Sequence, residues 1–156
     1  MGTHGQAALS AVELRDLGDI AGTMIPASTE FGIPGADAPA IVADIVKSLG
    51  RDLPLVREAL AAIAHKSGGA FATLGRDDRE ALVDAYCRTG GAAAAALARV
   101  ILAAYYRDDR VLLSLGLEAR APFPKGHELE QGDWSLLDVV RHRQPFWRGD
   151  RLARGN

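Results

Sequence analysis

Hydrophobic residues recur every three or four positions through most of the first 115 residues, with polar residues between them. This spacing predicts helices that each bury one face. A first helix is expected to begin at a capping box formed by Ser10 and Glu13 and to end before Pro26. Its expected buried face consists of Leu14, Leu17, Ile20, Ala21 and Met24.

Two further helices are expected after a loop of turn-forming residues at 26–37. Asp37 is expected to cap the second helix, residues 38–49, and Gly50 to end it. Asp52 is expected to cap the third helix, which closes at a Lys-Ser-Gly-Gly run. The expected buried faces consist of Ile41, Val42, Ile45, Val46 and Leu49, and of Leu55, Val56, Ala59, Leu60 and Ile63.

A fourth helix is expected to start at a cap by Asp77 and to break at the Thr-Gly-Gly run of 89–91. Residues 92–106 follow as a nearly all-apolar helix with Arg99 as its one charge, a pattern typical of the centre of a helical bundle. Its 15 residues fall short of the ~20 needed to span a bilayer, so no membrane span is expected. A short helix at 110–115 is expected to end the series.

These elements predict an all-α fold, a compact bundle of five or six helices over residues 1–117. The remaining 39 residues, 118–156, are expected to form a long irregular C-terminal arm that belongs to the same domain. The stretch APFPKGHELEQGDWSLLDVV, residues 121–140, has too many helix breakers for a helix and too little alternation for a strand. The arm is nevertheless aromatic, with Phe123, Trp134, Phe146 and Trp147. Disordered segments are usually poor in aromatics, so we expect the arm to pack, on its own bundle or on another protein.

Composition limits the classes of function. The net charge of −2 lacks the basic excess of nucleic-acid-binding proteins, so no nucleic acid is expected as a partner. The sequence as written starts without a secretory or twin-arginine signal, which favours a cytoplasmic location. The alternative is a periplasmic protein from which a twin-arginine signal has been removed.

Motifs for chemistry are few. The sequence contains neither the GxGxxG nor the GxxxxGK spacing of nucleotide-binding loops, and no two of its four histidines are spaced as a helical metal pair. We therefore expect no cofactor, metal or catalytic residue in this chain. His65 is expected to act as a charge at a helix C-terminus, and the lone Cys87 to be a buried core residue.

One enzymatic alternative stays open. In this alternative, a cleft between bundle and arm brings together Tyr105, Asp108, His127 and Glu128, with the histidine and glutamate as an acid–base pair. A surface hydrogen bond between the last two, and a helix cap in the Tyr-Tyr-Arg-Asp-Asp-Arg stretch, are the favoured interpretations.

The order of several motifs is informative. Asp19 lies in the first helix, and Ile-Pro-Ala (25–27) and Pro-Gly-Ala (34–36) precede the second. A Tyr-Tyr-x-Asp turn at 105–108 then leads through a Leu-Gly helix end into a Pro-x-Gly arm with an acidic Trp segment. In this order the motifs resemble the gluconate 2-dehydrogenase subunit 3 family, and the resemblance extends over about residues 10–148.

This resemblance implies a small, non-catalytic subunit. Family members accompany an FAD-dependent catalytic subunit of the glucose-methanol-choline type, which oxidises sugars, sugar acids or other alcohols, and some complexes add a c-type cytochrome. The small subunit binds, stabilises and helps to mature the flavoprotein, so the FAD would lie in the partner. A transient chaperone or adaptor for the same flavoprotein is the alternative. The partner is expected to contact Tyr105, Tyr106, Phe123, Pro124, Trp134, Phe146, Trp147 and Arg148.

Overall fold

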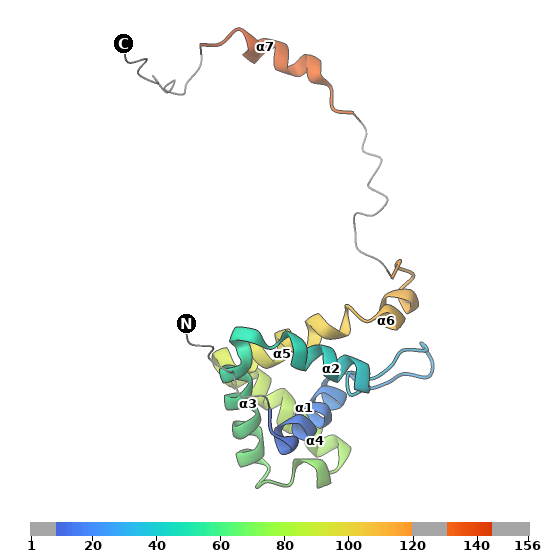
Figure 1. Cartoon of the computed structure of the whole chain (residues 1–156), viewed down its shortest axis with the longest axis vertical. Coiled ribbons are helices and arrows are strands. Elements are labelled where there is room, and N and C mark those ends of the chain that lie inside the picture. The colour runs from blue at the N-terminus through green and yellow to red at the C-terminus, as the bar shows by residue number, and fades with distance from the viewer. Residues whose placement is uncertain (1–8, 120–130, 145–156) are drawn as a thin grey trace, which may run out of the picture. The chain divides into compact units, whose positions relative to one another are not determined.

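The computed structural model describes residues 9–119 and 131–144 of the chain. By its internal contacts the chain divides into two units, Met1–Arg120 and Ala121–Asn156, and each is described by itself. The sequence analysis placed the boundary between bundle and arm after residue 117. The described residues form helices and loops, and the expectation of an all-α fold is confirmed (Figure 1).

The first helix starts as the sequence predicts. In helix α1 (Ala11–Met24) the backbone N–H of Glu13 donates to Ser10 Oγ at 3.2 Å, and the backbone N–H of Ser10 donates to Glu13 Oε2 at 2.7 Å. This reciprocal capping box satisfies two donors that the helix leaves free. The helix buries Leu17, Ile20 and Ala21, whereas Leu14, expected on the same face, is 42% exposed.

The second helix, α2 (Pro39–Ser48), begins one residue later than expected, and the prediction of an Asp37 cap is wrong. Proline occupies the first helical position, where its missing N–H costs nothing, and this makes Ala38 the N-cap. The expected end is confirmed, because Gly50 follows the helix with a φ of +44°, a conformation that glycine adopts readily.

The cap predicted for the third helix is also wrong. A 3₁₀ turn (Gly50–Asp52) leads into α3 (Leu53–Lys66), and the backbone of Asp52 is already helical, so its side chain does not cap. Its carboxylate instead accepts a hydrogen bond of 2.8 Å from Arg99 Nη2, the one charged side chain of the apolar helix α5 (Gly91–Tyr105).

The fourth helix, α4 (Arg76–Thr89), is preceded by a 3₁₀ turn, Phe71–Thr73. Gly75 is its N-cap, so the predicted cap by Asp77 is wrong and this carboxylate lies in the first turn. An acidic side chain there still interacts favourably with the helix dipole. Phe71 of the 3₁₀ turn is 4% exposed and belongs to the core, a contribution that the sequence analysis missed.

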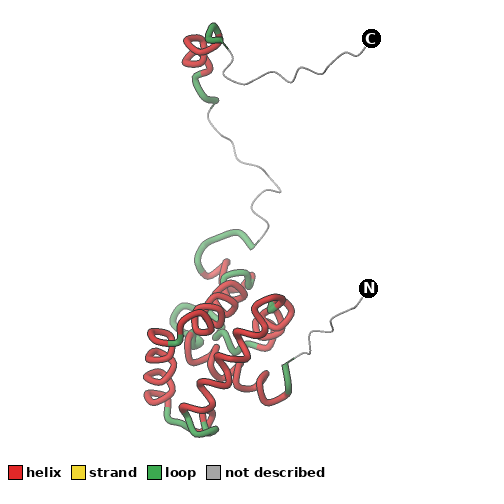
Figure 2. The backbone as a smooth tube through the Cα atoms, turned by 90° about the vertical axis from the view of Figure 1, so that its left-hand side faces the viewer, coloured by secondary structure: helices red, strands yellow, loops and turns green. Residues whose placement is uncertain are grey.

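Helix α5 is central to the bundle, as predicted. It packs against α2, α3 and α4, and α1 packs against the same three helices (Figures 1 and 2). Its buried side chains are Ala93, Ala94, Ala96, Leu97, Val100, Ile101, Ala104 and Tyr105. The helix is not buried all round, because Leu102 and Ala103 are exposed.

The last helix of the first unit is α6 (Asp109–Ser114), whose N-cap is Asp108. In the second unit, Trp134–Leu137 forms a 3₁₀ turn that continues into α7 (Asp138–Arg141). The expectation of an irregular arm is therefore wrong for these residues. Asp133 starts the turn by accepting from the backbone N–H of Ser135 at 3.0 Å, so a local cap favours helical structure where the sequence analysis expected none.

Candidate functional site

The two tyrosines expected at a partner surface lie in different environments. Tyr105 is 3% exposed, whereas Tyr106 is 53% exposed, and the two rings meet edge to face with centroids 5.4 Å apart. Burial, and then the neighbouring Tyr106 and Asp108, raise the pKa of Tyr105. Only Tyr106 of this pair is available to a partner, which differs from the expectation that both would be.

The buried hydroxyl of Tyr105 has a structural use. It donates a hydrogen bond of 3.2 Å to the carbonyl oxygen of Pro34, in the loop between α1 and α2. This bond joins two of the motifs on which the family resemblance rests, the Tyr-Tyr-x-Asp turn and the Pro-Gly-Ala loop. Neighbouring Ala36 of that loop is fully buried, so the loop is part of the core rather than a solvated connection.

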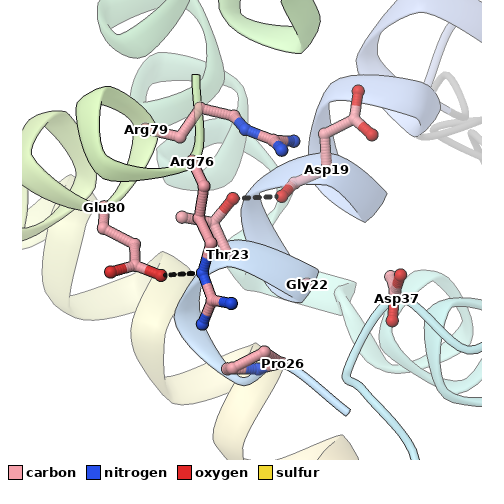
Figure 3. A pocket seen from close by; sticks show the side chains of 8 residues that line it. All are labelled: Asp19, Gly22, Thr23, Pro26, Asp37, Arg76, Arg79 and Glu80. Atoms are coloured by element: carbon pink, nitrogen blue, oxygen red, sulfur yellow. Dashed lines mark hydrogen bonds and ion pairs between the residues drawn. The ribbon is translucent and has the colours of Figure 1, made fainter. Parts of the chain in front are cut away.

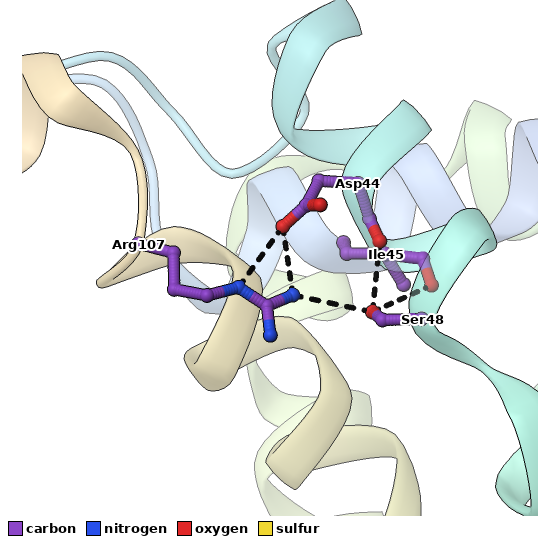
Figure 4. Close-up of polar contacts among 4 residues, drawn as sticks. All are labelled: Asp44, Ile45, Ser48 and Arg107. Carbon is purple, nitrogen blue, oxygen red and sulfur yellow. Dashed lines mark hydrogen bonds and ion pairs between the residues drawn. The ribbon is translucent and has the colours of Figure 1, made fainter. Parts of the chain in front are cut away.

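An ion pair fixes the chain at the end of α5. Arg107 donates to Asp44 Oδ2 from Nη2 at 2.7 Å and from Nε at 3.2 Å, and it also reaches Ser48 Oγ at 3.3 Å (Figure 4). Asp44 and Ser48 lie one turn apart on α2, so the guanidinium clamps the exit of α5 to this helix. Charged groups of this kind are half exposed and contribute modestly, about 0–1 kcal/mol for an exposed pair.

Asp108, a candidate in the enzymatic alternative, caps α6. Its carboxylate accepts from the backbone N–H of Arg110 at 3.0 Å and from the Arg110 guanidinium at 2.8–2.9 Å. The side-chain hydrogen bond from Arg110, followed by the backbone bonds, lowers the pKa of Asp108. This is the helix cap that the sequence analysis favoured for the stretch. His127 and Glu128, the other members of the alternative site, lie outside the described residues.

Large apolar side chains are exposed from the end of α5 through α6. They are Leu102, Tyr106, Leu113, Leu115 and Leu117, with exposed fractions between 41% and 62%. Single exposed apolar residues are ordinary on protein surfaces. Five within sixteen consecutive positions make this part of the first unit a candidate partner surface, which the sequence analysis anticipated only for Tyr106.

The second unit exposes a denser set. Trp134, predicted as an interface anchor, is 63% exposed, and its indole Nε1 donates to Gln131 Oε1 at 3.3 Å. Four more apolar side chains are at least 43% exposed around it: Leu136, Leu137, Val139 and Val140. The remaining predicted contacts, Phe123, Pro124, Phe146, Trp147 and Arg148, lie outside the described residues.

A polar pocket of about 240 Å³ opens between α1, the start of α4 and the loop before α2 (Figure 3). Two of its lining residues, Asp19 and Pro26, belong to the first motifs of the family resemblance, and Asp37 directly follows the Pro-Gly-Ala motif. The sequence analysis did not predict a pocket, because its α4 residues lie more than fifty positions further along the chain than its α1 residues. The other lining residues are Gly22, Thr23, Arg76, Arg79 and Glu80.

A second hollow on the same helix is mainly apolar. It has a volume of about 620 Å³ and lies between α1 and α2, with Leu14, Val42 and Val46 among its lining residues. Asp19 and Asp37 line both hollows. The groove explains why Leu14 and Val42 are only partly buried, although the sequence pattern placed them on core-facing sides of their helices.

The residues singled out for reactivity occupy ordinary positions. Cys87 is exposed on α4, so the expectation of a buried core cysteine is wrong. Partial desolvation of the thiol and then the Asp84 carboxylate raise the pKa of Cys87, whereas a reactive cysteine needs a lowered one. His65 lies in the last turn of α3, as expected. Within residues 9–119 and 131–144, no group of three or more His, Cys, Asp or Glu side chains is arranged to hold a metal ion.

Comparison of the chain with models of protein families, with curated proteins and with solved structures finds no match. Among the described residues no single helix has the length and hydropathy of a membrane span; α4 and α5 reach them only as a pair that is bent by 119°.

Proposed function

We propose that this protein is a small, non-catalytic subunit that binds and stabilises an FAD-dependent catalytic subunit of the glucose-methanol-choline type and helps it to mature. The catalytic subunit would carry the FAD and oxidise an alcohol or sugar. The observation that carries the proposal is the exposed apolar side of residues 134–140. Five of these seven side chains are large and apolar, and each is at least 43% exposed.

Such a surface is unfavourable in water unless something covers it. Burying one Leu or Val side chain contributes about 1.5–3 kcal/mol relative to leaving it exposed. Contiguous apolar patches on soluble proteins commonly mark interaction sites, and tryptophan is among the residues that contribute most to binding. Trp134 would therefore be the anchor, with Leu137 as its apolar neighbour in the same turn.

The second support comes from the motifs themselves. The motifs that resemble the subunit family are far apart in the sequence, and the bond between Tyr105 and Pro34 joins two of them. Asp19 and Pro26 meet at one pocket. The resemblance thus covers residues that cooperate in one structure, as residues of a shared scaffold would. The identity of the partner rests on the resemblance, and the presence of a partner surface rests on the exposed side chains.

The test is co-expression of this chain with a candidate flavoprotein of the glucose-methanol-choline type from the same genome. The tagged chain is purified, and the complex is analysed by size-exclusion chromatography with absorbance at flavin wavelengths. We expect a yellow complex of constant stoichiometry. A complex that forms during folding and then dissociates would instead indicate the transient chaperone.

A matched pair of variants locates the surface. Trp134→Ser combined with Leu137→Ser is expected to lower flavoprotein recovery at least tenfold, because two apolar anchors are removed. Val12→Ser is the control, since Val12 is 59% exposed on α1, in the other unit. Equal recovery with both variants would exclude residues 134–140 as the contact, and absence of a complex with the unchanged chain would contradict the proposed function.

A further inference from the structure

The polar pocket has a distinct set of walls. Asp19, Gly22 and Thr23 come from the second half of α1, and Arg76, Arg79 and Glu80 come from the first two turns of α4. In Figure 3, Arg79 and Asp19 lie at the upper rim, Pro26 lies below, and Glu80 and Asp37 lie on opposite sides. The volume of about 240 Å³ is smaller than the roughly 300–1,000 Å³ of sites for drug-sized ligands, so it suits a single side chain or a fragment of that size.

Some of the lining groups satisfy one another. Arg76 Nε donates to Glu80 Oε1 at 2.8 Å, one helical turn away on α4. Thr23 Oγ1 donates to the backbone oxygen of Asp19 at 2.7 Å. The Arg76–Glu80 pair and the Thr23 hydroxyl therefore already make hydrogen bonds within the protein, and they form polar walls of the pocket.

Other groups in the pocket have no partner among the residues that the structure describes. Arg79 Nε is buried, and it has no hydrogen-bond partner among the described residues. The side-chain carboxylates of Asp19 and Asp37 likewise make no hydrogen bond or ion pair within the described part of the chain. A buried donor without an acceptor costs about 1–3 kcal/mol.

The Asp37 side chain lies close to two glycines, Gly22 and Gly35. A Cβ added to Gly22 would lie 2.9 Å from both Cβ and Cγ of Asp37, and a Cβ added to Gly35 would collide with the Asp37 carboxylate. An added Cβ at Gly22 would press on the root of the Asp37 side chain, whereas at Gly35 it would meet mainly the movable carboxylate. The two glycines therefore leave room for the Asp37 side chain, which is exposed at the edge of the pocket.

We propose that this pocket binds one basic group together with a neighbouring carbonyl or carboxylate oxygen, as an arginine offers them. The pocket holds three carboxylates and two guanidinium groups, and this excess of one negative charge favours a cation. The ligand's guanidinium would donate to Asp19 and Asp37, and its oxygen would accept from the accessible part of the Arg79 guanidinium, since Nε itself is closed to solvent. Arginine reaches the pocket either as the free amino acid or as a residue of another protein.

The proposal is independent of the proposed partner, so the isolated full-length chain tests it. The Nε–H resonance of Arg79 and the backbone amides of Gly22 and Asp37 are followed by ¹⁵N-resolved NMR during three titrations. The probes are L-arginine, N-acetyl-L-arginine methylamide, and L-citrulline, which lacks the charge. We expect saturable shifts with an arginine probe and none with citrulline.

The two arginine probes distinguish the source. Shifts with L-arginine alone would identify a free amino-acid site, and shifts with the blocked form would identify a socket for an arginine residue of a polypeptide. Asp37→Asn should weaken the binding roughly 10- to 100-fold, the loss expected for one charged hydrogen-bond partner. Asp16→Asn, on α1 but outside the pocket lining, should leave the binding unchanged.

Two results would overturn the proposal. The first is the absence of saturable shifts with both arginine probes, and the second is an equal response to citrulline. A direct ion pair between Arg79 and Asp19 that fills the pocket in solution would give the first result. It would also show itself without ligand, because Asp19→Asn would then move the Arg79 Nε–H resonance strongly.

Discussion

The hydroxyl of Tyr105 and the carbonyl oxygen of Pro34 form a hydrogen bond of 3.2 Å across 71 positions of the chain. The tyrosine lies at the last residue of α5, and the proline lies in the loop before α2. The bond fixes the loop that contains the buried Ala36 to the central helix. It therefore couples the shape of the polar pocket, through the neighbouring Asp37, to the helix from which the candidate partner surface continues.

Removal of this bond should destabilise the fold. Tyr105→Phe keeps the buried ring but leaves the Pro34 carbonyl without its donor, at a cost of about 0.5–1.5 kcal/mol. Tyr106→Phe is the control, because its hydroxyl is on an exposed ring with no hydrogen bond in the described part of the chain. Urea unfolding measures both variants, and equal stability of the two would contradict the structural role of the bond.

Two glycines of α1 should respond oppositely to the same change. Gly18→Ala meets no atom within 4 Å, so it should stabilise the helix by about 0.5–1 kcal/mol. Gly22→Ala should lose this gain or destabilise the protein, because its Cβ would press on Cβ and Cγ of Asp37. Melting temperatures of both variants, and of Gly22→Ala combined with Asp37→Gly, test this. The double variant should recover part of the loss, and an equal gain from both glycine changes would refute the close approach.

Neighbouring positions on α5 should differ sharply in sensitivity. Ile101 is fully buried at the centre of the bundle, so Ile101→Ala should cost about 2–5 kcal/mol through lost burial and the cavity left behind. Leu102 is 41% exposed, and Leu102→Ala should cost less than about 1 kcal/mol. Denaturant unfolding of the two variants measures the difference, and a similar loss in both would argue against α5 as the core helix.

The capping box should make stability depend on pH. A hydrogen bond from the Ser10 backbone N–H, aided by the Ser10 side chain and Arg57, lowers the pKa of Glu13. The unfolded chain therefore binds this proton more readily, so the contribution is complete above the usual glutamate pKa of about 4.3 and is lost as pH falls through the lower folded value. Urea unfolding between pH 7 and pH 3 should show a smaller loss for Glu13→Gln than for the unchanged chain. Identical pH profiles would contradict the assignment.

The helices were predictable because periodicity reports burial directly, whereas the caps were predictable only in part. Ser10 with Glu13 forms its box from adjacent residues, so the sequence contains all that is needed. Asp37 and Asp52 look equally good as caps, but a proline start and a 3₁₀ turn displace the helix ends, and the Asp52 carboxylate instead pairs with Arg99. The short helical turn at 134–137 was missed because prolines and glycines nearby outweighed the local cap by Asp133.

The candidate sites also include residues that the local sequence predicted and residues that it did not. Tyr106 and Trp134 were predicted to contact a partner; both are exposed, and the contact itself stays a prediction. Tyr105 stands next to Tyr106 in the sequence, and only the three-dimensional arrangement turns one ring inward. The polar pocket joins α1 to α4, so no local pattern identifies it. Asp19 and Pro26 were the signal, since both belong to the motifs of the resemblance and both line the pocket.

The central claim is that this chain stabilises a flavin-dependent dehydrogenase. The most direct test is to express the dehydrogenase without this chain. The candidate flavoprotein is expressed with and without this chain, and the bound FAD per polypeptide and the dehydrogenase activity are measured on the purified flavoprotein. We predict that omission lowers the flavin content and the activity together, and that co-expression restores both. A flavoprotein with full FAD occupancy and full activity in the absence of this chain would contradict the claim.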